Sequence, residues 1–433
     1  MVSPTHPEKI VRGLQSPWFP IALAALAVPV RVGAVLALET YATPYHYSEH
    51  VTIARNILAG RGYSHDWYEL GSAGDGSAWP PLYVGAILAA YGVSPHAPWL
   101  TLQVFQSLVS AATVVLGYAI GRQLFGAPVG AVAGLWLAVY PPALAYALDI
   151  QSLTLETALV TAAVWGALRF HQRPTWAAAA LIGLLVGLAT LSRSHLLFWL
   201  PALAGVELAR GRWPAVRRLG LTLGVALAIV APWMIRNYQV HGAFVFVSTN
   251  GGISMFLGNN PRTTGTAIAE LSDLWKWYPD LARELAPLSE VERDRRLYAE
   301  AWAFIRAHPA EAAELALKKL YYFWWFKPDF TAGGVASGYP WYYGLAYIGA
   351  YVPVLVAARL GLIWSRGRWR DMTAVYLLFA LQTAVSMVYI AGTRYRGILE
   401  PLLIVFGAFA LVRLLSLLRR GLSAPRPAAL PSA

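Results

Sequence analysis

The fold is decided by the first apolar stretch and its sequel: residues 18–38 read WFPIALAALAVPVRVGAVLAL and residues 39–50 read ETYATPYHYSEH. At about 1.5 Å per residue, a helix over 18–38 is about 30 Å long, which matches the hydrocarbon core of a bilayer. The polar stretch that follows runs to Trp99 and is acidic, with Glu39, Glu49, Asp66, Glu69 and Asp75 against Arg55 and Arg61. A carboxylate-rich loop beside the mouth of a helix bundle indicates a catalytic or ligand-binding site there.

The composition indicates a membrane protein. Hydrophobic residues make up 57% of the 433 residues and charged residues 13%. A bilayer accommodates that much apolar surface, and a soluble protein of this size does not. The chain has no cysteine, which excludes disulfides and thiolate metal sites. Its net charge of +12 is spread over short loops, so we expect no nucleic-acid partner.

The apolar segments predict an all-α polytopic protein of about ten membrane spans, in a range of ten to twelve. Lys9 and Arg12 precede a full-length span without a small-residue cleavage site, so the first helix is expected to stay as an anchor. The expected spans are 18–38, 99–121, 128–147, 151–170, 176–192, 194–209, 217–236, 341–361, 372–391 and 398–417.

Charge assigns the sides of the membrane. Alternate segments hold most of the basic residues: Lys9, Arg12, Arg122, Arg169, Arg173, Arg210, Arg212, Arg217, Arg218, Arg366, Arg368, Arg370, Arg413, Arg419, Arg420 and Arg426. The opposite short loops hold Arg193, Arg394 and Arg396. Ten spans with both termini in the cytoplasm satisfy the positive-inside bias.

This topology leaves two long outer segments, 39–98 and 237–340. Residues 309–326 are interpreted as a juxtamembrane helix, because a span there would bury Lys318 and Lys319. Residues 81–91 are too short to cross and are expected at the outer surface. We expect one domain over 1–422 and a disordered Pro/Ala-rich tail over 423–433.

Glu49 is the leading candidate for a catalytic residue. Residues 47–58 have helical spacing, with Val51, Ala54 and Leu58 on a stripe expected to face the membrane. Glu49 would begin this helix, and a partly desolvated carboxylate there can act as a general base. The alternative is a charge that only stabilises the helix dipole. His46 and Glu39 compete for the same role.

Three other charged residues lie near the same expected face. Asp149 and Glu156 are seven residues apart, two helical turns, so both point along one side of the fourth span. The alternative roles are helix capping for Asp149 and an interhelical hydrogen bond for Glu156. Arg31 lies within the first span, where it needs a partner such as Glu39 or Glu49, unless it snorkels to the surface.

Four arginines are predicted at the outer ends of spans: Arg193, Arg236, Arg394 and Arg396. Together they favour an anionic ligand such as a lipid phosphate, since guanidinium groups bind phosphate through paired donors, although each also suits anchoring to headgroups. Further candidates for substrate contacts are Arg55, Tyr83, Asn237, Asn259 and Asn260. The Asn/Gly-rich segment 237–265 suits sugar hydroxyls and tight loops equally. Histidines 65, 96, 195 and 241 are scattered, so no metal or other cofactor is expected, and the sequence leaves a divalent metal open.

Several stretches, in order, resemble a known family. They are IARNILAGRGY (53–63), PPLY (80–83), LET (155–157), LSR (191–193), PWMIRNY (232–238), STNGG (248–252), GNNP (258–261), TG (264–265) and RYR (394–396). In this order the set is similar to bacterial GT-C glycosyltransferases of family 39, relatives of protein O-mannosyltransferases and of the lipid A aminoarabinose transferase. The resemblance covers most of residues 30–400 and implies a GT-C-like helix bundle with juxtamembrane helices on its outer face.

The resemblance also implies an activity and its residues. Such proteins take a sugar from a polyprenyl-phosphate donor on the outer face of the membrane and pass it to an acceptor, usually with inversion. The family's catalytic acid, typically Asp, maps to residues 46–49, where this chain has no Asp and Glu49 stands instead. A second family acid falls on Glu156, and the phosphate-holding arginines fall on Arg193, Arg394 and Arg396.

We therefore expect a membrane glycosyltransferase of the bacterial cell envelope, with a glycan, lipid or protein as acceptor. Two alternatives remain open from the sequence. One is a transporter or flippase of a lipid-linked substrate, although no internal repeat or broken mid-membrane helix is evident. The other is a catalytically inactive accessory protein, because the family's Asp is missing.

Overall fold

A computed structural model describes residues 12–42, 48–66, 69–71, 76–265, 271–326 and 341–422, and these ranges contain helices and loops but no β-strand. The helices of the first half are α2 (Trp18–Leu38), α3 (Glu49–Leu58), α4 (Pro81–Val93), α5 (Pro98–Phe125), α6 (Ala127–Ala138), α7 (Pro141–Leu148), α8 (Leu153–Gln172), α9 (Trp176–Thr190) and α10 (Trp199–Ala209). Those of the second half are α11 (Trp213–His241), α12 (Gly251–Gly258), α13 (Leu271–Trp277), α14 (Pro279–Leu285), α15 (Glu290–Ala307), α16 (Pro309–Trp324), α17 (Trp341–Ser365), α18 (Thr373–Val388), α19 (Thr393–Arg396) and α20 (Glu400–Leu422).

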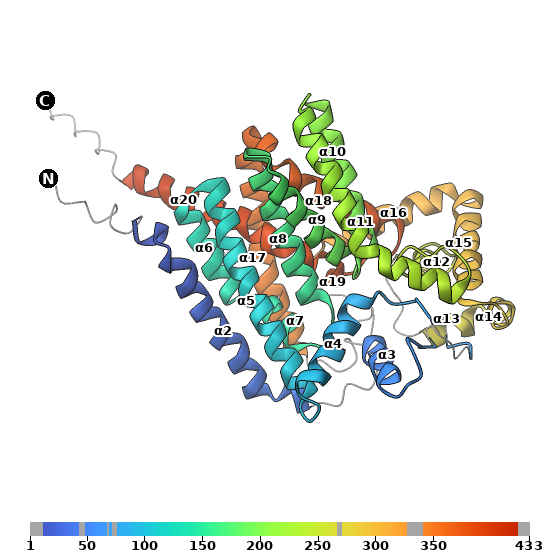
Figure 1. The fold of residues 1–433 in the computed structure, drawn as a ribbon. Coiled ribbons are helices and arrows are strands. Elements are labelled where there is room, and N and C mark those ends of the chain that lie inside the picture. Colours follow the sequence, from blue (N-terminus) through green and yellow to red (C-terminus); the bar gives the residue numbers. More distant parts are fainter. Residues whose placement is uncertain are drawn as a thin grey trace, which may run out of the picture.

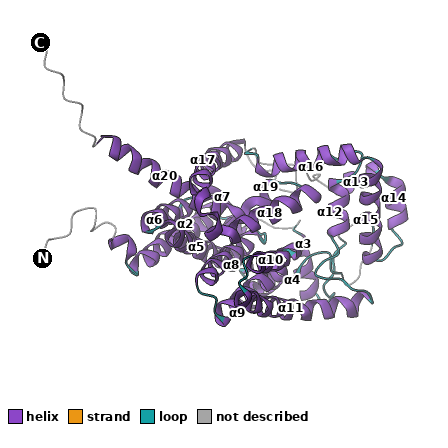
Figure 2. Ribbon diagram, turned by 90° about the horizontal axis from the view of Figure 1, so that it is seen from above, coloured by secondary structure: helices purple, strands orange, loops and turns teal. Residues whose placement is uncertain are grey.

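The long helices form one bundle, and the shorter helices α12 to α16 gather beside it, with α3 and α4 below (Figures 1 and 2). The largest hydrophobic core lies inside the bundle, between α5, α6, α8, α9, α17, α18 and α20. A second core, including Phe256, Trp275 and Leu297, holds α12 to α15 together. A third joins α3 and α4 to α5 and contains Val51, Tyr83 and Ile150.

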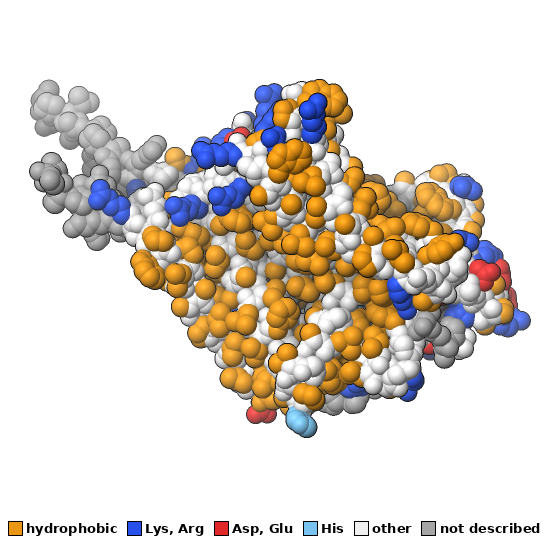
Figure 3. All heavy atoms as spheres, viewed as in Figure 1, with side chains coloured by type: hydrophobic (Ala, Val, Ile, Leu, Met, Phe, Trp, Pro, Cys, Tyr) orange, Lys and Arg blue, Asp and Glu red, His pale blue; other side chains and the backbone are white. Residues whose placement is uncertain are grey.

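The chain is a polytopic membrane protein. Six helical segments of the described residues are long and apolar enough to cross a membrane, or seven if one bent pair is counted. One of the six, Gly344–Val388, includes both α17 and α18. Figure 3 shows hydrophobic side chains covering the middle of the bundle, with Lys and Arg at its upper end. Each of the ten predicted spans coincides with helix, but 176–190 and 194–209 are shorter apolar helices, so the count of ten stays a prediction.

The outer segments contain the expected short helices. Residues 309–324 form α16, which does not count among the candidate spans, and residues 81–93 form α4. The stripe on α3 does not face the membrane, which corrects the prediction. Val51 and Ala54 are buried in the core shared with α4, and only Leu58 is exposed. The tail 423–433 lies outside the described residues.

The span predicted as one helix over 128–147 is broken into α6 and α7, which meet at 48°. Pro141 and Pro142 begin α7 and have no N–H to donate, so the carbonyl groups at the end of α6 lack helical partners. Arg31 of α2 supplies donors: its guanidinium donates to Ala138 O at 2.9 Å and to Leu137 O at 3.1 Å.

Neither partner predicted for Arg31 is correct. The side chain is 1% exposed and does not snorkel, and its Nε donates to Ser110 Oγ at 2.8 Å instead of to Glu39 or Glu49. Glu39 is exposed and ends α2 in a left-handed conformation. Backbone carbonyls freed by a helix break thus take the place of the expected carboxylate.

Replacing Arg31 with Met should destabilise the protein by at least about 2 kcal/mol, because it removes charged donors from buried carbonyls. The measurement is the thermal midpoint of the purified protein in detergent. Arg217→Met, at an exposed position on α11, is the matched control and should leave the midpoint nearly unchanged. Equal midpoints for the two variants would contradict a bracing role for Arg31.

Candidate functional site

Glu49 is the first residue of α3 and is only partly exposed. Burial raises the pKa of its carboxyl group above the usual 4.5, while its own backbone N–H and the nearby charge of Arg394 pull the pKa back down. The structure thus places Glu49 beside an arginine that is more than 340 positions away in the chain. The sequence prediction that Glu49 begins a helix is confirmed.

Glu156 of α8 is buried and fully engaged. Ser192 Oγ donates to Glu156 Oε1 at 2.6 Å and Ser152 Oγ donates to the same oxygen at 2.7 Å. Arg193 Nε donates to Glu156 Oε2 and forms an ion pair with it. A buried carboxylate with three donors holds its neighbours in place, so Glu156 fixes the orientation of Arg193.

Two arginines meet at the ring of Tyr395. The guanidinium carbon of Arg193 lies 5.3 Å from the ring centre and that of Arg394 lies 5.0 Å from it. Arg394 Nη2 also donates to Tyr395 Oη at 3.0 Å. Arg394 is in electrostatic reach of Glu49 and Glu156 as well. We call Glu49, Asp149, Glu156, Arg193, Arg394 and Tyr395 the Tyr395 cluster.

Asp149 follows α7 and is only partly exposed. Its carboxylate accepts from Ile150 N at 2.8 Å and from Gln151 Nε2 at 2.7 Å. Burial raises the pKa of Asp149, and the backbone donor of Ile150 and the charge of Arg394 oppose that rise. Asp149 therefore lies within electrostatic reach of the same arginine as Glu49.

Two buried glutamines of α5 hold the turn that carries Asp149. Gln106 Nε2 donates to Asp149 O at 2.7 Å and to Ala147 O at 3.0 Å, and Gln103 Nε2 donates to Leu148 O at 2.6 Å. On the other side, Tyr83 Oη of α4 donates to Gln106 Oε1 at 2.5 Å. We call Tyr83, Gln103 and Gln106 the glutamine clamp.

His50 links this clamp to Glu49. Its ring packs against Trp79 at 4.9 Å and edge-on against Tyr83 at 5.2 Å between centres. Burial lowers the pKa of His50 to about 4, so the ring is neutral at pH 7. The start of α3, with Glu49 at its tip, is thereby fixed to α4 and through Gln106 to the turn before α8.

Other predicted site residues lie elsewhere. Arg236 donates to Ser77 Oγ at 2.8 Å and to Gly76 O at 2.7 Å, and Asn237 accepts from Ser77 Oγ at 2.7 Å. The guanidinium of Arg236 also lies over Trp233, 4.9 Å from its ring centre. These residues tie the end of α11 to the loop before α4, and the structure does not bring them to the Tyr395 cluster.

Asn259 and Asn260 are buried at the end of α12. Asn259 accepts from Lys319 Nζ at 3.0 Å and donates to Val388 O at 2.8 Å. Asn260 accepts from Tyr278 Oη at 2.9 Å. Their amides thus join α12 to α16, to α18 and to the residue before α14, and a contact of either residue with substrate stays a prediction.

Arg396, two residues from Arg394, points away from the cluster. Its guanidinium is fully buried and donates to Phe323 O at 2.6 Å and to Trp325 O at 2.8 Å, with Glu400 3.7 Å away. It connects α19 to the end of α16. The four arginines predicted at the outer ends of spans therefore separate into a pair at Tyr395 and two that donate to backbone carbonyls elsewhere.

Three predicted residues remain. Arg55 lies over the ring of Trp99, 6.0 Å from its centre. Tyr83, a candidate for substrate contacts, is 1% exposed and belongs to the clamp through its hydrogen bond to Gln106. His46 lies outside the described residues.

Sequence reasoning missed several residues that build the cluster. Tyr395 and Ser192 stand inside the RYR and LSR stretches, beside arginines that were singled out. Gln103 and Gln106 are polar residues three apart in an apolar span, a spacing that puts both on one face of a helix. That spacing was a usable signal for buried hydrogen bonds.

Within the described residues, no three His, Asp or Glu side chains come close enough together to hold a metal ion. The Tyr395 cluster instead offers electrostatic interactions with a ligand. Arg193 and Arg394 keep guanidinium N–H groups that have no hydrogen-bond acceptor among the described residues. Such donors are suited to a phosphate, and the neighbouring carboxyl groups are suited to a proton transfer.

A family model and several solved structures match this chain. The family model of dolichyl-phosphate-mannose-protein mannosyltransferases matches residues 100–235, a range that includes Asp149, Glu156 and Arg193. No curated protein matches the chain. The resemblance to GT-C glycosyltransferases predicted from the sequence is confirmed by this match together with the structural likeness described next.

Among solved structures, the chain is similar to the oligosaccharyltransferase AglB from Archaeoglobus fulgidus in complex with an inhibitory peptide and a dolichol-phosphate. The TM-score is 0.54 at 13% identity, over 96% of this chain and 52% of that chain. The same organism's oligosaccharyltransferase with Zn and sulfate gives 0.53 at 13% identity, over 93% and 50%. ArnT from Cupriavidus metallidurans bound to undecaprenyl phosphate gives 0.42 at 16% identity, over 92% and 78%. The chain spans about half the length of the oligosaccharyltransferase structures.

The raised pKa of Glu49 makes a prediction about stability and pH. A carboxyl group whose pKa is higher in the folded state favours folding most below its usual pKa, here 4.5, and this contribution is lost as pH rises through the folded pKa. Glu49→Gln should therefore lose less thermal stability than the wild type between pH 4.5 and neutral pH. Glu39→Gln, at an exposed position, should keep the wild-type slope. Parallel slopes for all three proteins would rule out a desolvated Glu49.

The glutamine clamp makes a second prediction. Tyr83→Phe leaves the buried Oε1 of Gln106 without its donor and should cost about 1–3 kcal/mol of stability. The double variant Tyr83→Phe/Gln106→Leu should cost less than the sum of its single changes, because the two residues share one bond. The measurement is a double-mutant cycle on the thermal midpoint, with Tyr91→Phe on the same helix as the neutral control. Additive effects would mean that Tyr83 and Gln106 are not coupled.

Proposed function

We propose that this chain transfers a sugar from a polyprenyl-phosphate donor to an acceptor at the extracytoplasmic face of the membrane. The observation that carries the proposal is the Tyr395 cluster, in which two arginines with spare donors lie beside three carboxyl groups. The confirmed resemblance to GT-C glycosyltransferases, and the lipid phosphates named for AglB and ArnT, support this class of donor.

In the proposed reaction, an acceptor hydroxyl or amine attacks the anomeric carbon of the sugar. The new bond forms as the bond between that carbon and the phosphate oxygen breaks, so the configuration inverts and the lipid phosphate leaves with the electron pair. Glu49 receives the acceptor's proton. Of the three carboxyl groups, Glu156 is committed to Arg193 and two serines, and Asp149 to Ile150 and Gln151, so Glu49 is the group left to act as base.

The arginines stabilise the charge that develops on the leaving phosphate. Arg193 is held by Glu156 and Arg394 by Tyr395, so both are oriented before the donor binds. Preorganised donors of this kind need no reorganisation during the reaction. The phosphate is a good leaving group once its charge is stabilised, and no acid has to protonate it.

The proposal also includes the side of the membrane on which the Tyr395 cluster lies. The acidic cluster lies on the side of α3, α4 and the turn before α8, away from the arginine-rich helix ends. By the positive-inside bias, the arginine-rich ends face the cytoplasm, together with both termini. We infer a multi-pass protein of the bacterial inner membrane whose Tyr395 cluster faces outward.

The test combines lipid analysis with a matched pair of variants. In cells lacking the chain, one sugar-linked polyprenyl phosphate should accumulate and be visible by mass spectrometry. Wild type and Glu39→Gln should clear it, and Glu49→Gln should not, since removing a general base slows a reaction about 10²- to 10⁴-fold.

Two results would count against the proposal. An unchanged profile of lipid-linked sugars on deletion would mean that the chain consumes no such donor. Clearance by Glu49→Gln as fast as by Glu39→Gln would exclude Glu49 as the base and favour a transporter, which needs no proton acceptor at this position.

A further inference from the structure

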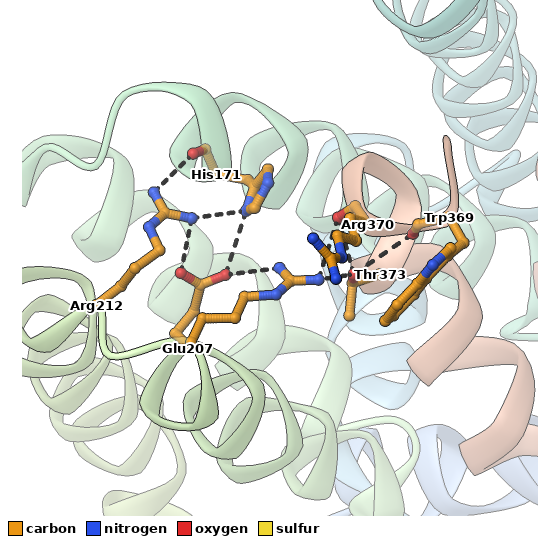
Figure 4. A network of polar contacts seen from close by, with 7 residues as sticks. His171, Glu207, Arg212, Trp369, Arg370 and Thr373 are labelled. Carbon is orange, nitrogen blue, oxygen red and sulfur yellow. Dashed lines mark hydrogen bonds and ion pairs between the residues drawn. The ribbon is translucent and has the colours of Figure 1, made fainter. Parts of the chain in front are cut away.

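A second group of charged residues lies where α8, α10 and α11 meet (Figure 4). Glu207 of α10 is 7% exposed and forms ion pairs with Arg212 at 2.7 Å and Arg210 at 3.3 Å, with His171 Nδ1 at 3.2 Å. Arg212 Nη2 also donates to His171 O at 2.9 Å. The carboxylate of Glu207 therefore binds two arginines of the loop between α10 and α11 and a histidine of α8.

Arg210 extends this group to the segment between α17 and α18. Its Nη2 donates to Thr373 Oγ1 at 2.6 Å and to Arg370 O at 3.3 Å. Arg370 itself is exposed, and its guanidinium lies 5.7 Å from the ring centre of Trp369. We call His171, Glu207, Arg210, Arg212, Arg370 and Thr373 the Glu207 network.

A pocket adjoins the Glu207 network and is lined by apolar and polar residues. Its apolar walls include Leu168, Phe170, Ile182, Leu203 and Leu219, from the bundle helices. Its polar side is formed by His171, Glu207, Arg370, Asp371 and Thr373. Since Arg370 and Asp371 are exposed, this polar side is the one that a ligand at the membrane surface would meet.

Positive charge exceeds negative charge here. Glu207 carries one charge against Arg210 and Arg212, while Asp371 is paired with Arg368 at 3.4 Å. Arg370 has no acceptor for its guanidinium among the described residues, and it adds a further positive charge. Lys and Arg side chains crowd this end of the molecule in Figure 3.

Aromatic side chains mark this end as a membrane boundary. Trp176 is 55% exposed beneath Arg218, and Trp213 is 60% exposed. Tryptophan prefers the level of lipid headgroups, so the Glu207 network sits at the depth of phosphates in a bilayer. The surface next to it includes the apolar side chain of Leu208, which is 46% exposed.

We propose that the Glu207 network binds the phosphate of an anionic phospholipid, with Arg370 as the residue that contacts the headgroup. In the pocket itself Arg370 and His171 lie beside Glu207 and Asp371, and the excess positive charge comes from arginines around it. Clusters of basic residues at a membrane boundary are suited to such headgroups. A phosphate bound by Arg370 would lie on the segment that Arg210 already ties to the end of α10. This site is separate from the Tyr395 cluster, and the proposal does not depend on the proposed function.

The test measures retention of phosphatidylglycerol by native mass spectrometry of the full-length protein purified in mild detergent. Arg370→Gln should weaken retention about fivefold, the effect of one charge near an anionic surface. Arg366→Gln, an exposed arginine on the same segment that does not line the pocket, is the matched control and should retain the lipid like the wild type. Both positions are on the surface, and equal thermal midpoints would show that both variants fold.

Two further comparisons test whether the bound group is an anionic phospholipid or a free phosphate. Phosphatidylcholine should not replace phosphatidylglycerol, and inorganic phosphate should not displace it. Equal loss in Arg370→Gln and Arg366→Gln would mean diffuse charge attraction and would overturn the proposal. Displacement by inorganic phosphate would overturn it as well, because the ligand would then be a free anion.

Discussion

A backbone carbonyl inside a bilayer has no water to bind, and this constraint shapes the molecule around the break between α6 and α7. The break leaves carbonyl groups without helical donors, and side chains of neighbouring helices supply them. At the break, Arg31 of α2 donates to the carbonyls of Leu137 and Ala138. At the other end of α7, Gln103 and Gln106 of α5 donate to the carbonyls of Ala147, Leu148 and Asp149. Because these donors are buried and directional, they fix the turn before α8. That turn carries Asp149 and leads into Glu156, so the candidate site depends on the side-chain donors at the end of α7.

Within the Tyr395 cluster, the carboxyl groups differ in what they are free to do. Glu156 accepts hydrogen bonds from two serines and forms an ion pair with Arg193. Glu49 lies at a helix start, where burial raises its pKa and Arg394 is the charge nearby that opposes the rise. Similar acids thus differ through their surroundings: Glu156 holds Arg193 in place, whereas Glu49 is the carboxyl group to which the proposed function assigns the proton transfer.

The sequence predicted the helical segments and the acids, because apolar length and charge spacing are local properties. It placed α3 with Glu49 at its start, and it singled out Glu156, Arg193 and Arg394, which the structure brings together. It failed where a polar residue satisfies backbone groups that are distant in the chain. Arg31 was assigned a carboxylate partner because a buried charge usually needs one, yet the carbonyls of a broken helix serve it. Asn259 and Asn260 suited sugar binding by composition, but whether an amide faces a ligand or a neighbouring helix depends on packing.

The RYR stretch (394–396) shows why sequence spacing alone could not distinguish an arginine of the candidate site from one that holds helices together. Arg394 and Arg396 stand two apart on the short helix α19, so their side chains point about 200° apart around its axis. Arg394 lies at Tyr395 near the carboxyl groups, whereas Arg396 is fully buried against carbonyls at the end of α16. The same helix therefore anchors the outer helices through one arginine and presents the other to the candidate site. Arg396 thus joins the end of α16 to the short helix that carries Arg394, so the outer helices and the candidate site share one connection.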